Sequence, residues 1–330
     1  MLSRVAEAIY WSNRYVERAE NVARFVNVNL NLYMDTPTEQ RSSWAPLMYT
    51  TGDHEWFLEH YGEPTKEAVT RFLTFDARYP NSIISTVRRA RENAQTVREV
   101  ISREMWQELN ELYLYVTETA RTQRDAVPEE LSDFYDRIKL AGIRFEGVMN
   151  ATLSHGDAWH FSNLGRMLER ADKTSRILDV KYFILLPHVT DVGSNLDQLG
   201  WTALLNSASA LQMYRQRYHV LTTNAVSEFL IFDRYFPRSM HHCVLKGQES
   251  LHAITGSPLD VCATDVERRL GQLRASLTYN TAEQVMQDGL HDFLDAFQNS
   301  LNQVGRSIHE HFFELSTPSM HPPPMVQGQV

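Results

Sequence analysis

The sequence predicts an all-α protein built from two tandemly duplicated helical bundles that pack with pseudo-two-fold symmetry. Three observations lead to this fold class. Glycine is scarce, with 14 residues among 330, so few positions interrupt a helix. The long stretches between prolines and glycines carry apolar residues three and four positions apart, which is the helical period. Finally, the chain repeats itself once, with roughly 155 residues between matching segments.

The first predicted helix begins close to the N-terminus and ends at a turn that contains Pro37. Its apolar stripe consists of Ala8, Trp11, Tyr15, Ala19, Val22 and Val26. Further helices are predicted over Ser82–Arg103, Met105–Thr122, Pro128–His155, Asn163–Leu186, Asp197–Gln212, Ala225–Phe232, Asp265–Thr278 and Thr281–Leu315. The tail from Ser316 is rich in proline and has little to bury, so it is predicted to be disordered or to lie loosely on the surface.

The repeat is visible in three pairs of segments. Residues 14–20 align with residues 166–172 at an offset of 152, and residues 72–82 align with residues 229–239 at an offset of 157. Six of the 15 positions from Arg14 to Val28 are identical to their counterparts, against roughly one expected by chance. The third pair is residues 131–136 and 290–295, at an offset of 159. These alignments indicate an old tandem duplication.

The alignments also set the predicted domain boundaries. They give a first helical repeat, a second helical repeat and a flexible Pro-rich tail, over residues 1–156, 157–315 and 316–330.

The composition argues against several classes of function. A formal net charge of −9 is unfavourable for a nucleic-acid-binding protein. No run approaches the roughly 18 apolar residues of a membrane span, and no export signal is visible, so a cytoplasmic location is predicted. Cys243 and Cys262 lack the spacing of a disulfide framework or zinc site. Only Glu249 and His252 have the Glu-x-x-His spacing, of which a helical di-iron site needs two, so no metal or cofactor is predicted.

Each half carries a Glu-Arg motif on a helix face opposite the apolar stripe: Glu17 and Arg18 in the first half, Glu169 and Arg170 in the second. An exposed face would hold only local ion pairs. However, the charges are retained between the halves while the apolar side varies, which indicates a further constraint. Either the face is a buried, satisfied charge network, or it lines a cavity that binds a charged ligand.

Two aspartates repeat in the same way. Asp76 and Asp233 each follow an aromatic segment and precede a proline turn, where Ser82 and Ser239 are placed to cap the next helix. A helix stop explains this pattern, and the alternative is that both aspartates face the Glu-Arg cleft. The candidate ligand-binding residues are therefore Arg14, Glu17, Arg18, Arg24, Arg166, Glu169, Arg170, Arg176, Asp76 and Asp233.

Several local motifs resemble the alpha-E family, also called DUF403, whose helical proteins are named for a Glu-Arg motif. The N-terminal residues 1–4, the Tyr10-Trp11 pair and the segment Tyr15–Asn21 carry the resemblance, which returns at Leu168–Asp172. It continues through residues 81–83, 90–94, 97–99, 105–106 and 109–110. Gln95 departs from the family pattern, which favours arginine after Glu-Asn-Ala.

The resemblance implies a functional link to circularly permuted ATP-grasp-like ligases and transglutaminase-like proteins in bacterial gene clusters. It therefore implies a part in peptide or amide-bond synthesis or modification. Two hypotheses follow. The chain is an auxiliary component that binds such a partner or its peptide product through the Glu-Arg faces. Alternatively, it is an enzyme in which Glu17 or Glu169 is the acid/base and nearby arginines hold a carboxylate or phosphate.

Overall fold

The computed structural model describes residues 1–35, 44–45, 47–48, 53–184 and 195–314, and every regular element within them is a helix. The predicted all-α class is thus confirmed. None of the helices in these ranges is both long and apolar enough to cross a bilayer. The predicted disordered tail lies outside the described residues.

The elements up to residue 152 begin with one long helix and continue with shorter ones. They are α1 (Ser3–Asp35), α3 (His54–Tyr61), α4 (Lys66–Phe75), α5 (Ile83–Thr96), α6 (Arg103–Thr122), a 3-10 turn (Pro128–Leu131) and α7 (Ser132–Thr152).

The elements from residue 157 again begin with a long helix. They are α8 (Asp157–Ile184), α9 (Asn195–Ser207), α10 (Leu211–Arg217), α11 (Thr223–Ser227), a π turn (Glu228–Phe232), α12 (Met240–Thr255), α13 (Asp265–Tyr279), α14 (Ala282–Asp288), α15 (Leu290–Ile308) and a second π turn (His309–Phe313).

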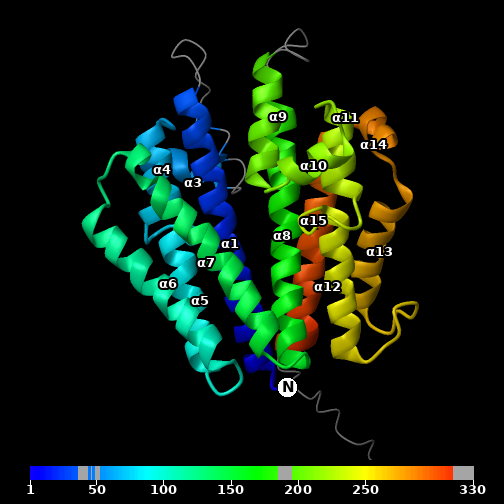
Figure 1. Ribbon diagram of the computed structural model, residues 1–330. Helices are drawn as coiled ribbons and strands as arrows, with labels where there is room; N and C mark the ends of the chain where they lie inside the picture. Colours follow the sequence, from blue (N-terminus) through cyan, green and yellow to red (C-terminus); the bar gives the residue numbers. More distant parts are fainter. Residues whose placement is uncertain (36–43, 46, 49–52, 185–194, 315–330) are drawn as a thin grey trace, which may run out of the picture.

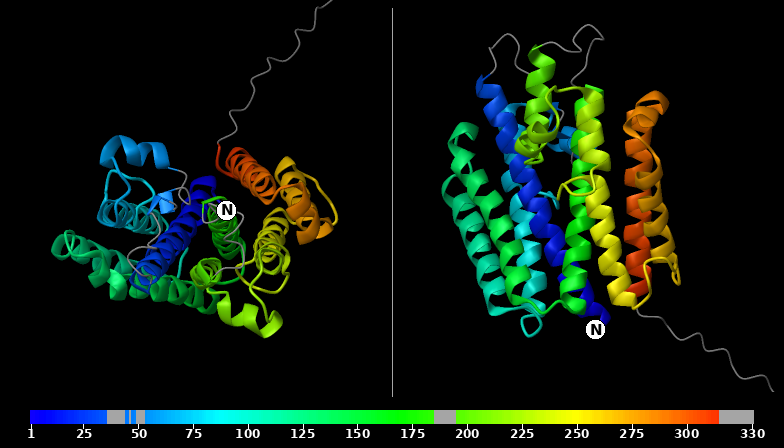
Figure 2. Two further views of the ribbon diagram at one scale, coloured as in Figure 1. Left: turned by 90° about the horizontal axis from the view of Figure 1, so that it is seen from above. Right: turned by 45° about the vertical axis from the view of Figure 1, so that its right-hand side comes forward.

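The two long helices, α1 and α8, pack against each other in the middle of the molecule (Figure 1). Helices α5 and α7 cover α1 on one side, and α12 and α15 cover α8 on the other. The view from above shows the same two groups on either side of the central pair (Figure 2). Because each long helix has neighbours on several sides, its polar face is buried as well as its apolar stripe.

The central pair approaches closely at Gly165. A Cβ atom at this position would lie 2.5 Å from the backbone oxygen of Tyr10, closer than real Cβ contacts. Glycine therefore lets α8 touch the backbone of α1, and the side chains that follow on both helices meet across a short gap.

Several predicted boundaries differ from the structure for local reasons. The helix predicted to reach Arg103 ends at Thr96, because a turn intervenes before Ser102 caps α6. The helix predicted from Thr281 divides at Gly289, which has a φ of +114°. The predicted caps are confirmed: the hydroxyls of Ser82 and Ser239 each accept a hydrogen bond from the backbone three residues on. No range was predicted for α3, α4 or α12, although the helix that Ser239 was predicted to cap is α12.

Candidate functional site

The Glu-Arg motifs meet at the interface of α1 and α8, in two groups of buried charges. The first group, the Glu17 cluster, centres on a carboxylate that is 2% exposed. Arg170 donates to both oxygens of Glu17, at 2.9 and 2.7 Å, and Arg238 donates to one of them at 3.0 Å. The whole cluster consists of Glu17, Glu20, Arg24, Glu146, Arg166, Arg170 and Arg238.

The second group, the Glu169 cluster, centres on a carboxylate with no exposed surface. Arg18 donates to both oxygens of Glu169, at 2.6 and 2.9 Å, and the Nε of Arg14 donates to one of them at 2.9 Å. The whole cluster consists of Arg14, Arg18, Glu169, Asp172, Lys173 and Arg176.

The two central pairs are reciprocal. Glu17 of α1 binds Arg170 of α8, and Glu169 of α8 binds Arg18 of α1. In each Glu-Arg motif, the glutamate therefore pairs with the arginine of the other helix, and the arginine pairs with the glutamate of the other helix. These ion pairs join segments more than 150 residues apart in the sequence, and they hold the two central helices together.

The arginines keep both glutamates ionised. Burial alone would raise the pKa of the Glu17 carboxyl, but the charges of Arg170 and Arg238 outweigh it and hold this pKa far below the ordinary value. The pKa of Glu169 is likewise well below its usual range, because Arg18 and Arg14 outweigh the effect of burial. A general acid/base needs a pKa near the working pH, so these surroundings favour a structural role for both carboxylates.

The local ion pairs expected on a wet surface are present, but one is buried and the other is partly buried. Glu20 pairs with Arg24 at 2.6 Å, and Asp172 pairs with Arg176 at 3.0 Å. Of the two alternatives that the sequence left open, the geometry supports the buried network for most of the candidate residues. The exceptions are the arginines that begin the two motifs, Arg14 and Arg166, because each also lines a cavity.

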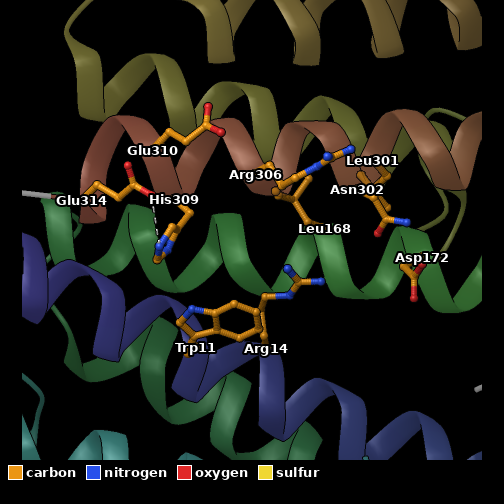
Figure 3. A pocket seen from close by; sticks show the side chains of 11 residues that line it. Trp11, Arg14, Leu168, Asp172, Leu301, Asn302, Arg306, His309, Glu310 and Glu314 are labelled. Atoms are coloured by element: carbon orange, nitrogen blue, oxygen red, sulfur yellow. Dashed lines mark ion pairs between the residues drawn. The ribbon is translucent and has the colours of Figure 1, made fainter. Parts of the chain in front are cut away.

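The Arg14 cavity has a volume of about 420 Å³ and lies between α1, α8 and α15. Figure 3 shows Trp11 and Arg14 facing the helix that carries Arg306 and His309. The guanidinium of Arg14 lies 5.0 Å from the Trp11 ring centroid, and its Nη1 donates to the hydroxyl of Tyr10 at 3.1 Å. All three nitrogens of Arg14 thus have partners.

The Arg166 cavity has a volume of about 340 Å³ and lies between α7, α8 and α12. Arg166 is buried; its Nη2 donates to Asn163 at 2.7 Å and its Nη1 lies 3.0 Å from Glu146. Its Nε is buried and has no hydrogen-bond partner among the described residues. Burial therefore lowers the pKa of Arg166, and Glu146 only partly offsets the effect.

Asp76 and Asp233 lie in the turns that follow α4 and the first π turn. Asp76 accepts from Tyr61 at 2.7 Å and from the backbone of Arg78 at 2.9 Å. Asp233 accepts from the backbone N–H groups of residues 235 and 236, both at 2.7 Å. These contacts match the helix-stop interpretation, and a ligand-binding role for either aspartate stays a prediction.

Sequence reasoning missed two residues that belong to the Glu17 cluster, Arg238 and Glu146. Arg238 bridges Glu17 and Glu20, and Glu146 joins Arg166 to Arg170. Arg238 stands at the position that the 157-residue offset pairs with Asn81, which accepts from Arg18 at 2.6 Å. The alignment of the two positions could have pointed to Arg238, because both residues contact a Glu-Arg motif. The change from asparagine to arginine hid this correspondence. Nothing in the sequence singled out Glu146.

The buried motif agrees with comparisons to known proteins. Residues 1–313 match the model of Alpha-E, a predicted alpha-helical domain with a conserved ER motif. The chain belongs to the Alpha-E family. Two relatives are the uncharacterized proteins Rv2567 of Mycobacterium tuberculosis and Mb2597 of Mycobacterium bovis, each 23% identical over 313 residues that cover 87% of this chain. The chain spans about a third of the length of these Alpha-E relatives, 34% in both cases, and no solved structure matches it.

Proposed function

We propose that this Alpha-E chain is an auxiliary binding component of a bacterial peptide or amide-bond synthesis or modification system. It works beside a circularly permuted ATP-grasp-like or transglutaminase-like protein, the partners that the family resemblance implies. One observation carries the auxiliary role: Glu17 and Glu169 are both buried and each is held by two arginines. The glutamates that would act as acid/base instead form the ion pairs that join α1 and α8.

The relatives support a role beside other domains. In Rv2567 and Mb2597 the matching region is only 34% of the chain, so there this unit is part of a longer polypeptide. A domain that acts within a longer protein is well placed to present a surface or ligand to its neighbours.

The test is direct association with a circularly permuted ATP-grasp-like protein from the same organism. The purified proteins should elute together on size exclusion and give a binding isotherm by calorimetry. An unrelated ATP-dependent ligase is the control and should elute separately. If the two proteins elute apart and show no heat of binding at high concentration, the partnership is wrong.

The alternative function is an enzyme that acts on a carboxylate- or phosphate-bearing substrate. The observation in its favour is that Arg14 and Arg166 both line cavities beside the clusters. Glu17→Gln and Glu169→Gln test it, since an acid/base role predicts loss of product in the reconstituted system at a temperature where the variants remain folded. Unchanged product with either variant excludes that residue as the acid/base.

A further inference from the structure

The Glu17 cluster contains more positive than negative charge. Among the described residues, four cations stand against three carboxylates, an excess of one: Arg24, Arg166, Arg170 and Arg238 against Glu17, Glu20 and Glu146. A buried cation without a counter-ion is costly, because desolvation is not repaid by pairing. The Glu17 cluster therefore holds one positive charge that its own carboxylates do not neutralise.

Arg166 is the cation of this cluster whose hydrogen bonding is least complete. Its one ion-pair partner among the described residues is Glu146, which also pairs with Arg170 at 2.8 Å. Its Nε is buried without a hydrogen-bond partner in the part of the chain that the structure describes. A buried N–H of a charged group is left unsatisfied only rarely, since the loss costs about 1–3 kcal/mol or more.

A second donor or acceptor is unsatisfied in the same cavity. The Nδ1 of His160 is buried and has no partner among the described residues, and His160 lines the Arg166 cavity together with Lys246. Lys246 adds a positive charge at the rim, 2.8 Å from Glu249. Two of the residues that line the cavity, Arg166 and His160, thus have unused hydrogen-bonding capacity, and a third, Lys246, carries a positive charge.

We propose that the Arg166 cavity binds the carboxylate of a peptide, with Arg166 Nε as the principal donor. A monoanion matches the excess of one charge. A doubly charged phosphate fits less well, because Glu146 and Glu249 line the same cavity. Trp159, Met167 and Pro237 contribute apolar groups to the same wall, which suits the side chain or backbone attached to the carboxylate.

This inference deepens the proposed function, because it names a peptide carboxylate as the ligand of an auxiliary component. The volume of about 340 Å³ accommodates one or two residues, not a long segment. The carboxylate can belong to the chain end of a peptide or to an acidic side chain, and the two sources share the same recognition chemistry.

The test is calorimetry of the full chain with small probes. N-acetyl-alanine, which has a free chain-end carboxylate, should bind, whereas N-acetyl-alaninamide should not. Arg166→Met should weaken binding about tenfold or more, because hydrogen bonds to charged groups contribute about 1.5–3 kcal/mol. Arg306→Met, the same substitution in the Arg14 cavity, is the matched control and should leave the affinity unchanged.

A third probe, N-acetyl-aspartic acid α-amide, distinguishes the two sources, since tighter binding than N-acetyl-alanine assigns an acidic side chain and weaker binding assigns a chain end. A crystal soaked with the better probe should place its carboxylate at hydrogen-bond distance from Arg166 Nε. This keeps the proposal testable if Arg166→Met fails to fold.

Equal binding of the acid and the amide, tighter binding of inorganic phosphate than of either acid, or unchanged affinity in Arg166→Met would overturn the proposal. These experiments need no partner protein. Loss of the ligase interaction would therefore leave the peptide-carboxylate site standing, and loss of the site would leave the interaction standing.

Discussion

The Glu17 and Glu169 clusters each join a glutamate of one central helix to an arginine of the other, yet they differ in how completely their leading arginines are paired. In the Glu169 cluster every nitrogen of Arg14 has a partner, and Tyr10 and Glu169 raise its pKa above the ordinary value despite burial. In the Glu17 cluster Arg166 keeps an unpartnered Nε. A repeated motif therefore does not guarantee repeated chemistry.

The acceptors of the two central glutamates account for the difference at Nε. Glu169 accepts from the Nε of Arg14. Glu17, by contrast, accepts from Arg170, Arg238 and Asn21 and not from Arg166.

The residue one helical turn earlier makes a second difference, at Nη1. Tyr10 precedes Arg14 by four positions and accepts from it. The corresponding position before Arg166 is Ser162, a shorter side chain whose hydroxyl already accepts from Asn13 at 3.0 Å. The residues around a motif therefore determine whether the hydrogen-bond donors of its arginine are all satisfied within the protein.

Removal of a central carboxylate should have the largest effect. Glu169→Gln leaves Arg14, Arg18 and Lys173 without their shared anion. The free energy of unfolding should fall by about 3–5 kcal/mol, as expected when one partner of a buried pair is lost. Urea denaturation measures it, with the exposed Glu99→Gln as a control that should change stability by less than about 0.5 kcal/mol. A loss below about 1 kcal/mol for Glu169→Gln would show that this cluster does not hold the helices.

Truncation of the leading arginines should separate the two clusters. Arg14→Met removes hydrogen bonds to the charged Glu169 and should lower the free energy of unfolding by about 2 kcal/mol. Arg166→Met replaces an incompletely paired buried charge with an apolar side chain, and should cost less than about 1 kcal/mol. Equal losses in the two variants would refute the difference in pairing.

Acid should weaken both clusters. The folded-state pKa values of Glu17 and Glu169 lie below the ordinary value of 4.5, so the unfolded chain takes up these protons first. Their contribution to stability is therefore present above about pH 4.5 and is lost as the pH falls toward the folded-state values. The urea midpoint should fall between pH 5 and pH 3, less steeply in Glu169→Gln than in the unmodified chain; parallel slopes would contradict the assignment.

The smallest effect should come from Gly305, the position that the 159-residue offset pairs with Glu146. A Cβ atom there would meet Arg14 Nη1 at 4.0 Å, an ordinary contact. Gly305→Ala within α15 should therefore raise the free energy of unfolding by about 0.5–1 kcal/mol. Gly142→Ala is the contrasting variant, because its Cβ would collide with the Glu20 carboxylate, and it should destabilise. Thermal denaturation of both variants decides the comparison.

The helical class and the Glu-Arg residues were accessible from sequence because both depend on local patterns. Periodicity placed α1, and retention of charge in both motifs indicated that Glu17 and Glu169 face something other than water. Tandem duplication, the domain boundaries and the pseudo-two-fold symmetry stay predictions, although the reciprocal pairs are what such symmetry would produce.

The rest of the site depends on contacts between distant segments, which no local pattern reports. The bridge by Arg238 requires α1 to lie beside the segment that precedes α12, 221 residues away. The unpartnered Nε of Arg166 depends on Glu17 being occupied by Arg170, Arg238 and Asn21. Neither fact follows from spacing, because both depend on which acceptors the packed helices leave free.

The ion pairs between α1 and α8 also constrain the order in which the chain can fold during its synthesis. Glu17 emerges early, but its partners Arg170 and Arg238 lie 153 and 221 residues further on. Until they are synthesised, Glu17 lacks these counter-charges and must stay hydrated. The central helix of the nascent N-terminal region therefore cannot close before residue 238 has emerged, so a premature stop ahead of that residue leaves a fragment with an unprotected interior.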